Sequence, residues 1–257
     1  MQNNTFSALF VGQNIVRLLC VDSTNDYLKN QLSKSAPLPE GTVILADEQK
    51  AGRGQQNNVW YSEPGKNLTL SLLLKPSFLS ISQQFVLNKA ISLAINEVLQ
   101  SIIGDHAKIK WPNDMYVKNH KIGGVLIENV IQGNKWKYAI IGIGLNVNQE
   151  HFPPEAKKAT SMLKILHTDY DLQFLLTQLC SSIEAWYLKL KTDKIKDVDE
   201  SYLTKLYRFN ETASYQANGE VFNARIVGVD SSGLLQLDSG DSIRSYNIKE
   251  VEFLDWI

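Results

Sequence analysis

Two short segments carry the residue types that a site for a phosphorylated ligand requires. The first is Gly52-Arg53-Gly54-Gln55-Gln56, which is closed by Trp60, and the second is Lys110-Trp111-Pro112-Asn113-Asp114, followed by Lys121-Ile122-Gly123-Gly124. Glycine allows a close backbone approach, so successive N–H groups can converge on an anion. Arg53 adds a permanently charged fork and Lys121 a compact ammonium. Together these features predict an anion-binding site.

Each segment has an ordinary alternative when taken alone. Gly-Arg-Gly and Pro-Asn-Asp both occur in plain surface turns, and a single lysine usually lies solvated on the surface. Two further motifs flank them in order, Asp22-Ser23-Thr24-Asn25 before and Gly142-Ile143-Gly144-Leu145-Asn146-Val147-Asn148 after. The combination of all four motifs indicates a functional site.

In this order the motifs resemble those of the biotin protein ligase family, the biotin–[acetyl-CoA-carboxylase] ligases. The resemblance runs from about Ile15 to the C-terminus. It implies synthesis of biotinyl-5′-AMP from biotin and ATP with Mg²⁺, followed by transfer of biotin to one lysine of a biotin carboxyl carrier domain. It implies no bound prosthetic group. Some family members carry an N-terminal helix-turn-helix, which the short start up to Gln13 lacks, so we expect an enzyme without an operator-binding role.

The match to the family pattern also implies roles for individual residues. Lys121 is expected to reach the biotin carboxylate, Arg53 to hold the phosphate, and Asp114 either to orient Mg²⁺ or to take a proton from the incoming lysine. The expected ATP or adenylate contacts are Arg53, Gln55, Lys110, Trp111, Asn113 and Asn146. The expected biotin-binding residues are Ser23, Thr24, Asn25, Gln49, Gly52, Arg53, Gly54, Gln55, Lys121, Gly123 and Gly124.

Several of these residues have structural alternatives that stay open at this point. Ser23 and Thr24 are also good helix N-caps, and Trp60 and Trp111 are equally suited to core packing. Gly142-Ile143-Gly144 is not read as a dinucleotide fingerprint, because the third glycine and the following helix are missing. Asn146 and Asn148 alternate, so both should point to the same face of a strand.

The implied first reaction step explains why cations are needed. A carboxylate and an α-phosphate repel, and at 4 Å with an effective dielectric constant near 20 each pair of unit charges costs roughly 4 kcal/mol. A site for this step therefore needs cations and N–H donors between the two anions.

Bulk composition narrows the class of protein. The 257 residues are 44% hydrophobic and 21% charged, as in ordinary globular proteins, and the net charge of −1 gives no footprint for nucleic acid. Cys20 and Cys180 both lie in apolar stretches, so we expect two buried thiols without a disulfide. No signal peptide and no apolar segment long enough to span a bilayer is expected, which favours a cytoplasmic protein. Monomer and homodimer both stay open.

Hydrophobic patterning predicts an α+β fold in two domains, a mixed sheet with helices packed on one side followed by a small SH3-like β-barrel. The first domain is expected to span residues 1–209 and the second 210–257. Helices are expected at 24–33, 82–103, 172–190 and 197–207. Strands are expected at 15–21, 42–46, 68–74, 108–111, 125–131 and 136–142, and then at 212–216, 221–229, 234–237 and 243–246.

Two rival functions remain at this stage. A ligase for lipoate or octanoate has a similar scaffold, but the Gly52-Arg53-Gly54 and Lys110–Asp114 motifs match the biotin branch. A non-catalytic biotin or nucleotide sensor would bind ligand without needing the paired cations, which this chain retains.

One departure from the family pattern generates a first prediction. Many members have a second arginine where this chain has Gln55, and further basic residues where it has Gln56, Asn57 and Asn58. With one guanidinium in the loop, biotinyl-5′-AMP should escape more readily. We therefore expect Gln55→Arg to slow its dissociation, measured as the off-rate of labelled intermediate. Equal off-rates for the two proteins would remove this inference.

Overall fold

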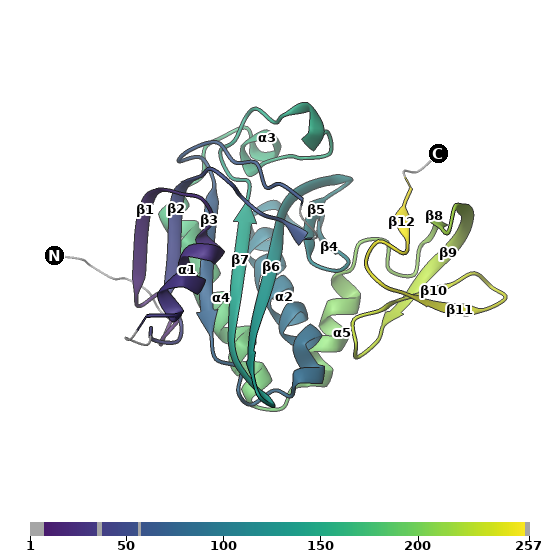
Figure 1. The fold of residues 1–257 in the computed structure, drawn as a ribbon. Coiled ribbons are helices and arrows are strands. Elements are labelled where there is room, and N and C mark those ends of the chain that lie inside the picture. Colours follow the sequence, from purple (N-terminus) through teal and green to yellow (C-terminus); the bar gives the residue numbers. More distant parts are fainter. Residues whose placement is uncertain (1–7, 35–37, 56–57, 255–257) are drawn as a thin grey trace.

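The larger part of the protein is a seven-stranded mixed sheet in strand order β1-β2-β3-β7-β6-β5-β4 (Figure 1). The computed structural model describes residues 8–34, 38–55 and 58–254. β1 and β2 are parallel and all other neighbours in this sheet are antiparallel. The strands are β1 (Ile15–Val21), β2 (Val43–Gln49), β3 (Leu68–Leu74), β4 (Ala107–Lys110), β5 (Asp114–Val117), β6 (His120–Gln132) and β7 (Lys135–Leu145).

Helices cover the two faces of this sheet unequally. The long helices α2 (Gln84–Ile103) and α4 (Leu172–Lys191), together with α5 (Ile195–Lys205), pack on one face, as expected. The nine-residue helix α1 (Thr24–Leu32) lies on the opposite face, where Leu28 packs in a small cluster with β-strand residues. β3 lies between the two layers and is buried at all seven positions. A continuous apolar run such as Leu68–Leu74 is the pattern expected for a strand covered on both sides.

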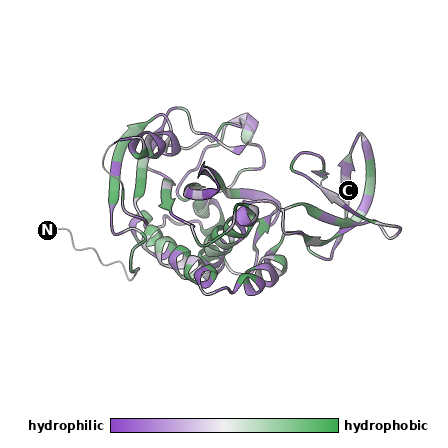
Figure 2. Ribbon diagram, turned by 60° about the horizontal axis from the view of Figure 1, so that its bottom comes forward, coloured by the Kyte–Doolittle hydropathy of each residue, from purple (hydrophilic) through white to green (hydrophobic). Residues whose placement is uncertain are grey.

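The α2 helix is the centre of the main core. Together with the preceding 3₁₀ turn it forms a 23-residue segment, Ile81–Ile103, that is long and apolar enough to cross a membrane by length and composition. The expectation that no segment reaches this length is therefore wrong. However, 72% of its most apolar window is buried inside the protein, as in the core helix of a globular protein. Figure 2 shows the long helices with hydrophobic and hydrophilic residues alternating along them.

The C-terminal strands form a second, antiparallel sheet in the order β11-β10-β9-β8-β12. It begins at Thr212, close to the expected boundary, and among the described residues its pairing leaves β11 and β12 as edges. The Trp111 indole N–H donates to the Gly233 carbonyl oxygen at 2.9 Å and ties the two sheets together. The strands are β8 (Thr212–Ala217), β9 (Glu220–Val229), β10 (Leu235–Asp238), β11 (Ile243–Tyr246) and β12 (Glu252–Phe253).

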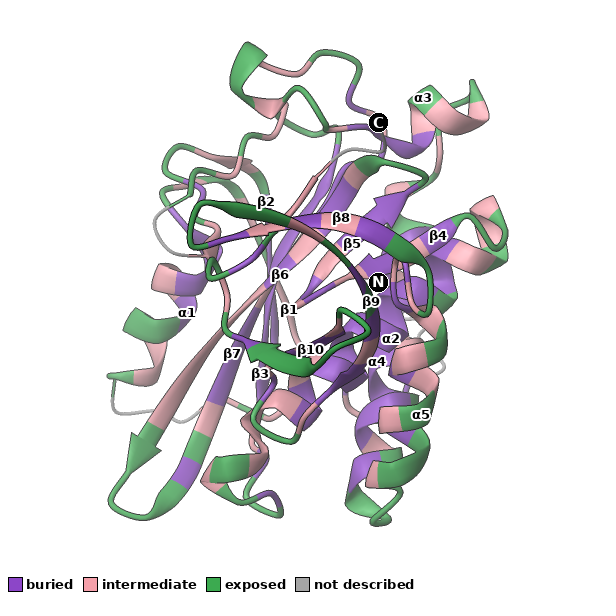
Figure 3. Ribbon diagram, turned by 90° about the vertical axis from the view of Figure 1, so that its right-hand side faces the viewer, coloured by how far each residue is buried: buried purple, intermediate pink, exposed green. Residues whose placement is uncertain are grey.

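The structure extends three predicted strands, with β2 reaching Gln49, and adds short elements that were not predicted. β6 starts five residues earlier than expected, at His120, and β7 continues to Leu145, so the glycines of both motifs lie inside strands and not in loops. The predicted hairpin between them is confirmed, with a turn at Gly133-Asn134 and Gly133 at φ 58°. The short strands β5 and β12 and the five-residue helix α3 (Met162–Leu166) were not predicted, since all three are too short to show a period. Figure 3 shows that the far end of the β6–β7 hairpin is exposed.

Of the two thiols, only Cys180 is buried, so the expectation for Cys20 is wrong. Cys20 lies in β1, which has a single neighbouring strand and whose side chains are exposed or half-buried. An apolar run at the edge of a sheet is covered less than the same run at its centre. No disulfide joins the two residues, as expected.

This difference predicts the thiol reactivity of the folded protein. Burial raises the pKa of the Cys180 thiol to about 12, and the side chain is also inaccessible. We expect a maleimide at pH 8 to label one thiol per chain, at Cys20, and both thiols after unfolding in guanidinium. Peptide mapping that finds Cys180 labelled in the folded protein would contradict the burial seen here.

Candidate active site

A cavity of about 140 Å³ lies on the sheet face that carries α1. Strand register defines its floor, because directly paired residues point to the same face. A first row crosses the sheet through Asp114, Gly124, Gly144 and Thr69. A second row, two residues further along β6, contains Leu126, Gly142 and Ser71, and a third contains Glu128, Ile140 and Leu73.

The glycines of the first two rows leave space for side chains that lie directly against them. A Cβ on Gly142 would be 2.7 Å from Asn25 Oδ1, and one on Gly144 would be 2.4 Å from the Trp60 ring. A Cβ on Gly124 would be 3.0 Å from an Asp114 carboxylate oxygen. The Gly-Ile-Gly motif therefore makes room on a strand face, in place of the tight turn of a dinucleotide-binding loop.

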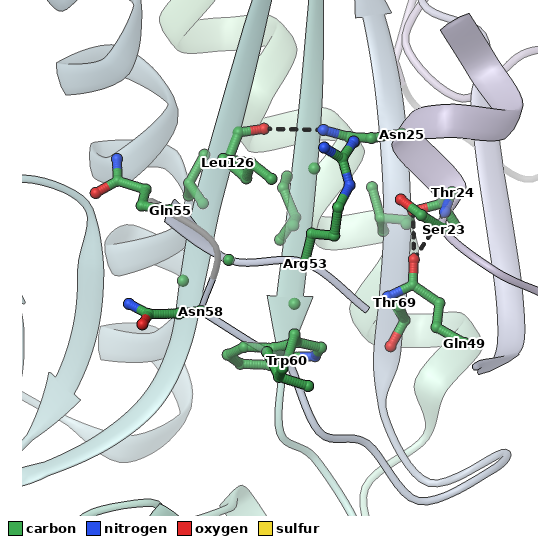
Figure 4. A pocket seen from close by; sticks show the side chains of 18 of the residues that line it. Ser23, Thr24, Asn25, Gln49, Arg53, Gln55, Asn58, Trp60, Thr69 and Leu126 are labelled. Atoms are coloured by element: carbon green, nitrogen blue, oxygen red, sulfur yellow. Dashed lines mark hydrogen bonds between the residues drawn. The ribbon is translucent and has the colours of Figure 1, made fainter. Parts of the chain in front are cut away.

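Residues at the start of α1 form the polar wall of the cavity. Ser23 is the N-cap, its hydroxyl oxygen accepting from the Asp26 N–H at 3.4 Å, and it lines the cavity as well. The Thr24 N–H and hydroxyl donate to Gln49 Oε1 at 2.8 and 3.0 Å. Figure 4 shows Ser23, Thr24 and Gln49 gathered on one side and Asn25 turned toward β6. These four of the expected biotin-binding residues are thus brought together in space.

Two described segments, residues 52–55 and 58–60, lie beside the cavity and are together called the glycine loop. Trp60 N–H donates to the Gly52 carbonyl at 2.9 Å and Gly54 N–H to the Asn58 carbonyl at 2.7 Å, so these two segments pair in antiparallel fashion. A Cβ on Gly52 would be 2.5 Å from the Trp60 carbonyl oxygen, which explains this glycine. Gln55 and Asn58 line the cavity, whereas Gln56 and Asn57 lie outside the described residues.

Arg53 lies in this loop, but its guanidinium is already occupied by protein carboxylates. One nitrogen, Nη2, is 2.6 Å from Asp26 Oδ1 and 3.0 Å from Glu128 Oε2. Glu128 Oε2 also accepts from Asn25 Nδ2 at 2.7 Å. In Figure 4 the Arg53 side chain extends along the strands toward Asn25 and away from Trp60.

A second cavity of about 480 Å³ adjoins the first, and Val59, Trp60 and Lys121 line both. At this junction the Lys121 ammonium is 2.6 Å from Asp114 Oδ1 and 5.8 Å from the centre of the Trp60 ring. Trp60 Nε1 is buried and has no hydrogen-bond partner within the described part of the chain. The remaining lining of the second cavity is aromatic and basic: Tyr61, Tyr116, Phe152, Lys157 and Lys158, with Asn146, Pro154, Glu155, Ala156 and Ala159.

The structure places some of the expected nucleotide contacts in a cavity and others outside both cavities. Asn146 lines the second cavity, and its Oδ1 is buried without a hydrogen-bond partner among the residues that the structure describes. Lys110 lies between the rings of Tyr116 and Phe253, 4.9 and 5.0 Å from their centres, where burial lowers its pKa. Trp111 and Asn113 line neither cavity. Trp111 packs against the second sheet, and the Asn113 amide donates to the Val125 carbonyl.

Asn148 does not share the role of Asn146. Its amide exchanges two hydrogen bonds of 2.9 Å with the backbone of Tyr170, so it anchors a loop. Gly123 lies beneath Gly144 and Leu145, and a Cβ there would be 2.9 Å from the Gly144 carbonyl oxygen. It therefore serves close strand packing and does not line the cavity.

Sequence reasoning missed Asp26, Glu128 and Ser71. The Ser71 hydroxyl contacts Thr24 Oγ1 at 2.7 Å and Asn25 Oδ1 at 2.5 Å. A signal was present for Glu128, since it is a charged residue inside the apolar run 125–131. Ser71 is likewise a polar residue inside the apolar run Leu68–Leu74.

Metal ligation has little support from the protein side chains. Among the residues that the structure describes, no group of three or more His, Cys, Asp or Glu lies together. The Asp114 carboxylate, which lines the first cavity, is paired with Lys121.

The floor glycines generate a prediction. Gly142→Ala should displace Asn25 and weaken biotin binding about tenfold or more, because the new Cβ would be 2.7 Å from Asn25 Oδ1. Isothermal titration with biotin alone measures this effect. Gly228→Ala is the control, because this strand glycine lies in the second sheet and its Cβ would meet only the end of the flexible Gln236 side chain. Equal biotin affinity of the two variants would show that the space above Gly142 is not needed.

Comparison with known proteins shows the family to which this chain belongs. The model of the biotin/lipoate A/B protein ligase family matches residues 18–146. The bifunctional ligase/repressor BirA of Bacillus spizizenii is 30% identical over 249 residues, covering 94% of this chain and 74% of the relative. The biotin--protein ligase of Homo sapiens is 29% identical over 233 residues, covering 84% of this chain and 31% of the human protein.

A solved structure extends the similarity to the whole fold. The biotin protein ligase from Aquifex aeolicus, in complex with biotin and ATP, superposes with a TM-score of 0.77 at 28% identity, covering 93% of this chain and 98% of that one. Family model, relatives and fold agree with one another. The chain belongs to the biotin/lipoate A/B protein ligase family, in its biotin protein ligase branch.

Proposed function

We propose that this protein activates biotin with ATP to biotinyl-5′-AMP and transfers the biotin to the ε-amino group of a lysine on a biotin carboxyl carrier domain. Biotin would occupy the cavity above the glycine rows, and the nucleotide the cavity lined by aromatic rings and lysines. The lipoate or octanoate alternative is not favoured, because the relatives and the solved structure are biotin ligases.

The observation that carries the proposal is the position of Lys121 on the border between the cavities. The carboxylate of the first ligand and the α-phosphate of the second must meet where the two cavities join. An ammonium at that point offsets the repulsion of roughly 4 kcal/mol for each pair of unit charges. The side chain is about one-third exposed, so its charge is partly screened until ligands fill both cavities.

Backbone geometry holds Lys121 in place. Its N–H donates to the Lys158 carbonyl at 2.6 Å, and its own carbonyl accepts from the Thr160 N–H at 2.8 Å. Asp114 contacts the ammonium from the neighbouring strand β5. The charged group is therefore fixed from two sides before any ligand binds, which is the preorganisation that electrostatic catalysis needs.

The two steps use the same groups. In the first, a biotin carboxylate oxygen attacks the α-phosphorus and pyrophosphate leaves, while Lys121 neutralises the oxygens between the cavities. In the second, the carrier amine attacks the acyl carbon and the bond to the phosphate oxygen breaks, releasing AMP. Asp114 is the carboxylate at this point, and we assign it the role of accepting the proton of the amine.

Magnesium belongs to the proposal as a companion of the nucleotide. Mg²⁺ keeps several water ligands and binds through one or two carboxylates together with substrate phosphates. One junction carboxylate, Asp114, fits that donor set, and pyrophosphate would supply the remaining oxygens. When bound, the ion neutralises the charge of the leaving pyrophosphate.

The partner and location are also part of the proposal. A biotin carboxyl carrier domain of a biotin-dependent carboxylase would present its lysine at the open mouth of the first cavity. ATP and unmodified carriers occur together in the cytoplasm, where we place the reaction.

Lys121→Ala tests the mechanism. We expect it to abolish biotin-dependent ATP–pyrophosphate exchange, a loss of at least about a hundredfold by analogy with removal of one preorganised charge-stabilising donor. The thermal unfolding midpoint should stay near that of the wild type, because this side chain is partly exposed. Near-normal exchange by the variant would rule out the role of Lys121.

The function as a whole is tested by transfer of labelled biotin, with ATP and Mg²⁺, to an apo carrier domain, with lipoate as competitor. Label on the carrier lysine that lipoate does not reduce supports the proposal. Binding of biotin without transfer would point to a sensor, and incorporation of lipoate to the rival ligase.

A further inference from the structure

Arg53 has a place in the structure that its sequence motif does not explain. Its guanidinium connects three chain segments: the glycine loop, α1 through Asp26, and β6 through Glu128. Among residues 52–55 and 58–60, the backbone hydrogen bonds stay within the loop. The Arg53 side chain therefore provides a polar tie from this loop to the walls of the biotin cavity.

Strand β6 shows how far this tie is from the junction of the cavities. Lys121 lies beside Gly124 in the first row, where a Cβ would be 3.4 Å from its ammonium. Glu128 lies in the third row, four residues further along the strand. At about 3.3 Å per residue, the two rows are about 13 Å apart. The guanidinium is thus held at the end of the biotin cavity opposite to the shared lysine.

The negative charge around Arg53 also opposes binding of a phosphate by its guanidinium. Two carboxylates surround one guanidinium, so this end of the cavity already carries more negative than positive charge. Removing the guanidinium would leave Asp26 and Glu128 without their counter-ion and close to each other. A triphosphate would be repelled by both groups, whereas a neutral heterocycle would not.

Glu128 connects Arg53 to Asn25, a side chain that lines the cavity. Its Oε2 accepts from Arg53 at 3.0 Å and from the Asn25 amide at 2.7 Å. The Asn25 amide also reaches the Leu126 carbonyl at 3.4 Å, and its Oδ1 contacts the Ser71 hydroxyl. Glu128 thereby fixes which side of Asn25 donates and which accepts, next to the space above Gly142.

We infer that Arg53, Asp26 and Glu128 form a positioning latch, which holds the glycine loop over the biotin cavity and orients Asn25, and that Arg53 acts on biotin affinity and not as the phosphate ligand. This inference rests on the proposed function for the identity of the ligand. It names two positioning residues, Asp26 and Glu128, and keeps only one of the two roles that the family pattern implies for Arg53, the effect on biotin and not the contact with the phosphate.

The two roles of Arg53 make opposite predictions for separate ligands. We would titrate biotin alone, and α,β-methylene-ATP alone, into the wild type, Arg53→Gln, Glu128→Gln and the double variant. Glu128→Gln keeps an acceptor oxygen for Asn25 but loses the charge that holds Arg53. The latch predicts that both single variants bind biotin about three- to tenfold more weakly, the range of one or two partly exposed ion pairs, and bind the nucleotide within twofold of the wild type.

The biotin affinity of the double variant, and its dependence on salt, distinguish a latch from general loss of structure. The double variant should bind biotin no more weakly than Arg53→Gln, because both substitutions break the same contact. Arg53→Lys should recover part of the affinity, and the wild-type advantage should shrink in 1 M salt. Arg225→Gln is the matched control, because Arg225 forms a similar exposed pair with Asp238 at 3.1 Å in the second sheet. This control should leave biotin affinity unchanged.

Three results would overturn the inference. Loss of nucleotide affinity in Arg53→Gln with biotin affinity intact would assign Arg53 to the phosphate. An unchanged biotin affinity in Glu128→Gln, or additive losses in the double variant, would show that no latch exists. A wild-type protein that binds no biotin would instead refute the proposed function, and the latch with it.

Discussion

The repulsion between a carboxylate and a phosphate is the constraint on which the arrangement of this protein depends. Both anions must approach one point, and the structure places one ammonium there, on the border between two cavities. The backbone of Lys121 is bound on both sides to the 158–160 segment, and Asp114 contacts the ammonium from β5. A flexible surface lysine would have to be ordered during the reaction, whereas this one is ordered by the sheet beforehand.

Charge is distributed unevenly along the first cavity as a result. One end carries the balanced pair of Lys121 and Asp114, and the other carries a guanidinium with two carboxylates. Between them the floor is glycine and small or apolar side chains. A ligand with a charged head and a neutral, hydrogen-bonding ring fits this distribution in one orientation, with its head toward the lysine.

Much of the fold could be predicted from the sequence, because long periodic segments such as 84–103 and 172–191 and the continuous run Leu68–Leu74 leave few alternatives. The motif residues Ser23, Thr24, Asn25 and Gln49 were also found, and the structure brings them together. Strand ends at glycines could not be predicted. The sequence shows that Gly142 and Gly144 lack side chains, but not that the Asn25 amide and the Trp60 ring occupy the space above them. The predicted strands 125–131 and 136–142 are therefore shorter than β6 and β7.

The ion-pair partners of Arg53 could not be predicted from the sequence either. Asp26 and Glu128 are far from Arg53 in sequence, and neither stands in a recognisable motif with it. Exposure of Cys20 depends on β1 being an edge strand, which is a property of strand order and not of the strand itself.

The glycine floor also limits how the substrate range of such an enzyme can change during evolution. Every substitution at Gly124, Gly142 or Gly144 adds atoms, so single mutations at these positions can only make the cavity smaller. Acceptance of a bulkier acid must therefore arise at lining positions that still have side chains to lose, such as Thr69, Leu70, Val125, Leu126 and Ile143. At the glycine positions the descendants of this protein can become more selective, but not more permissive.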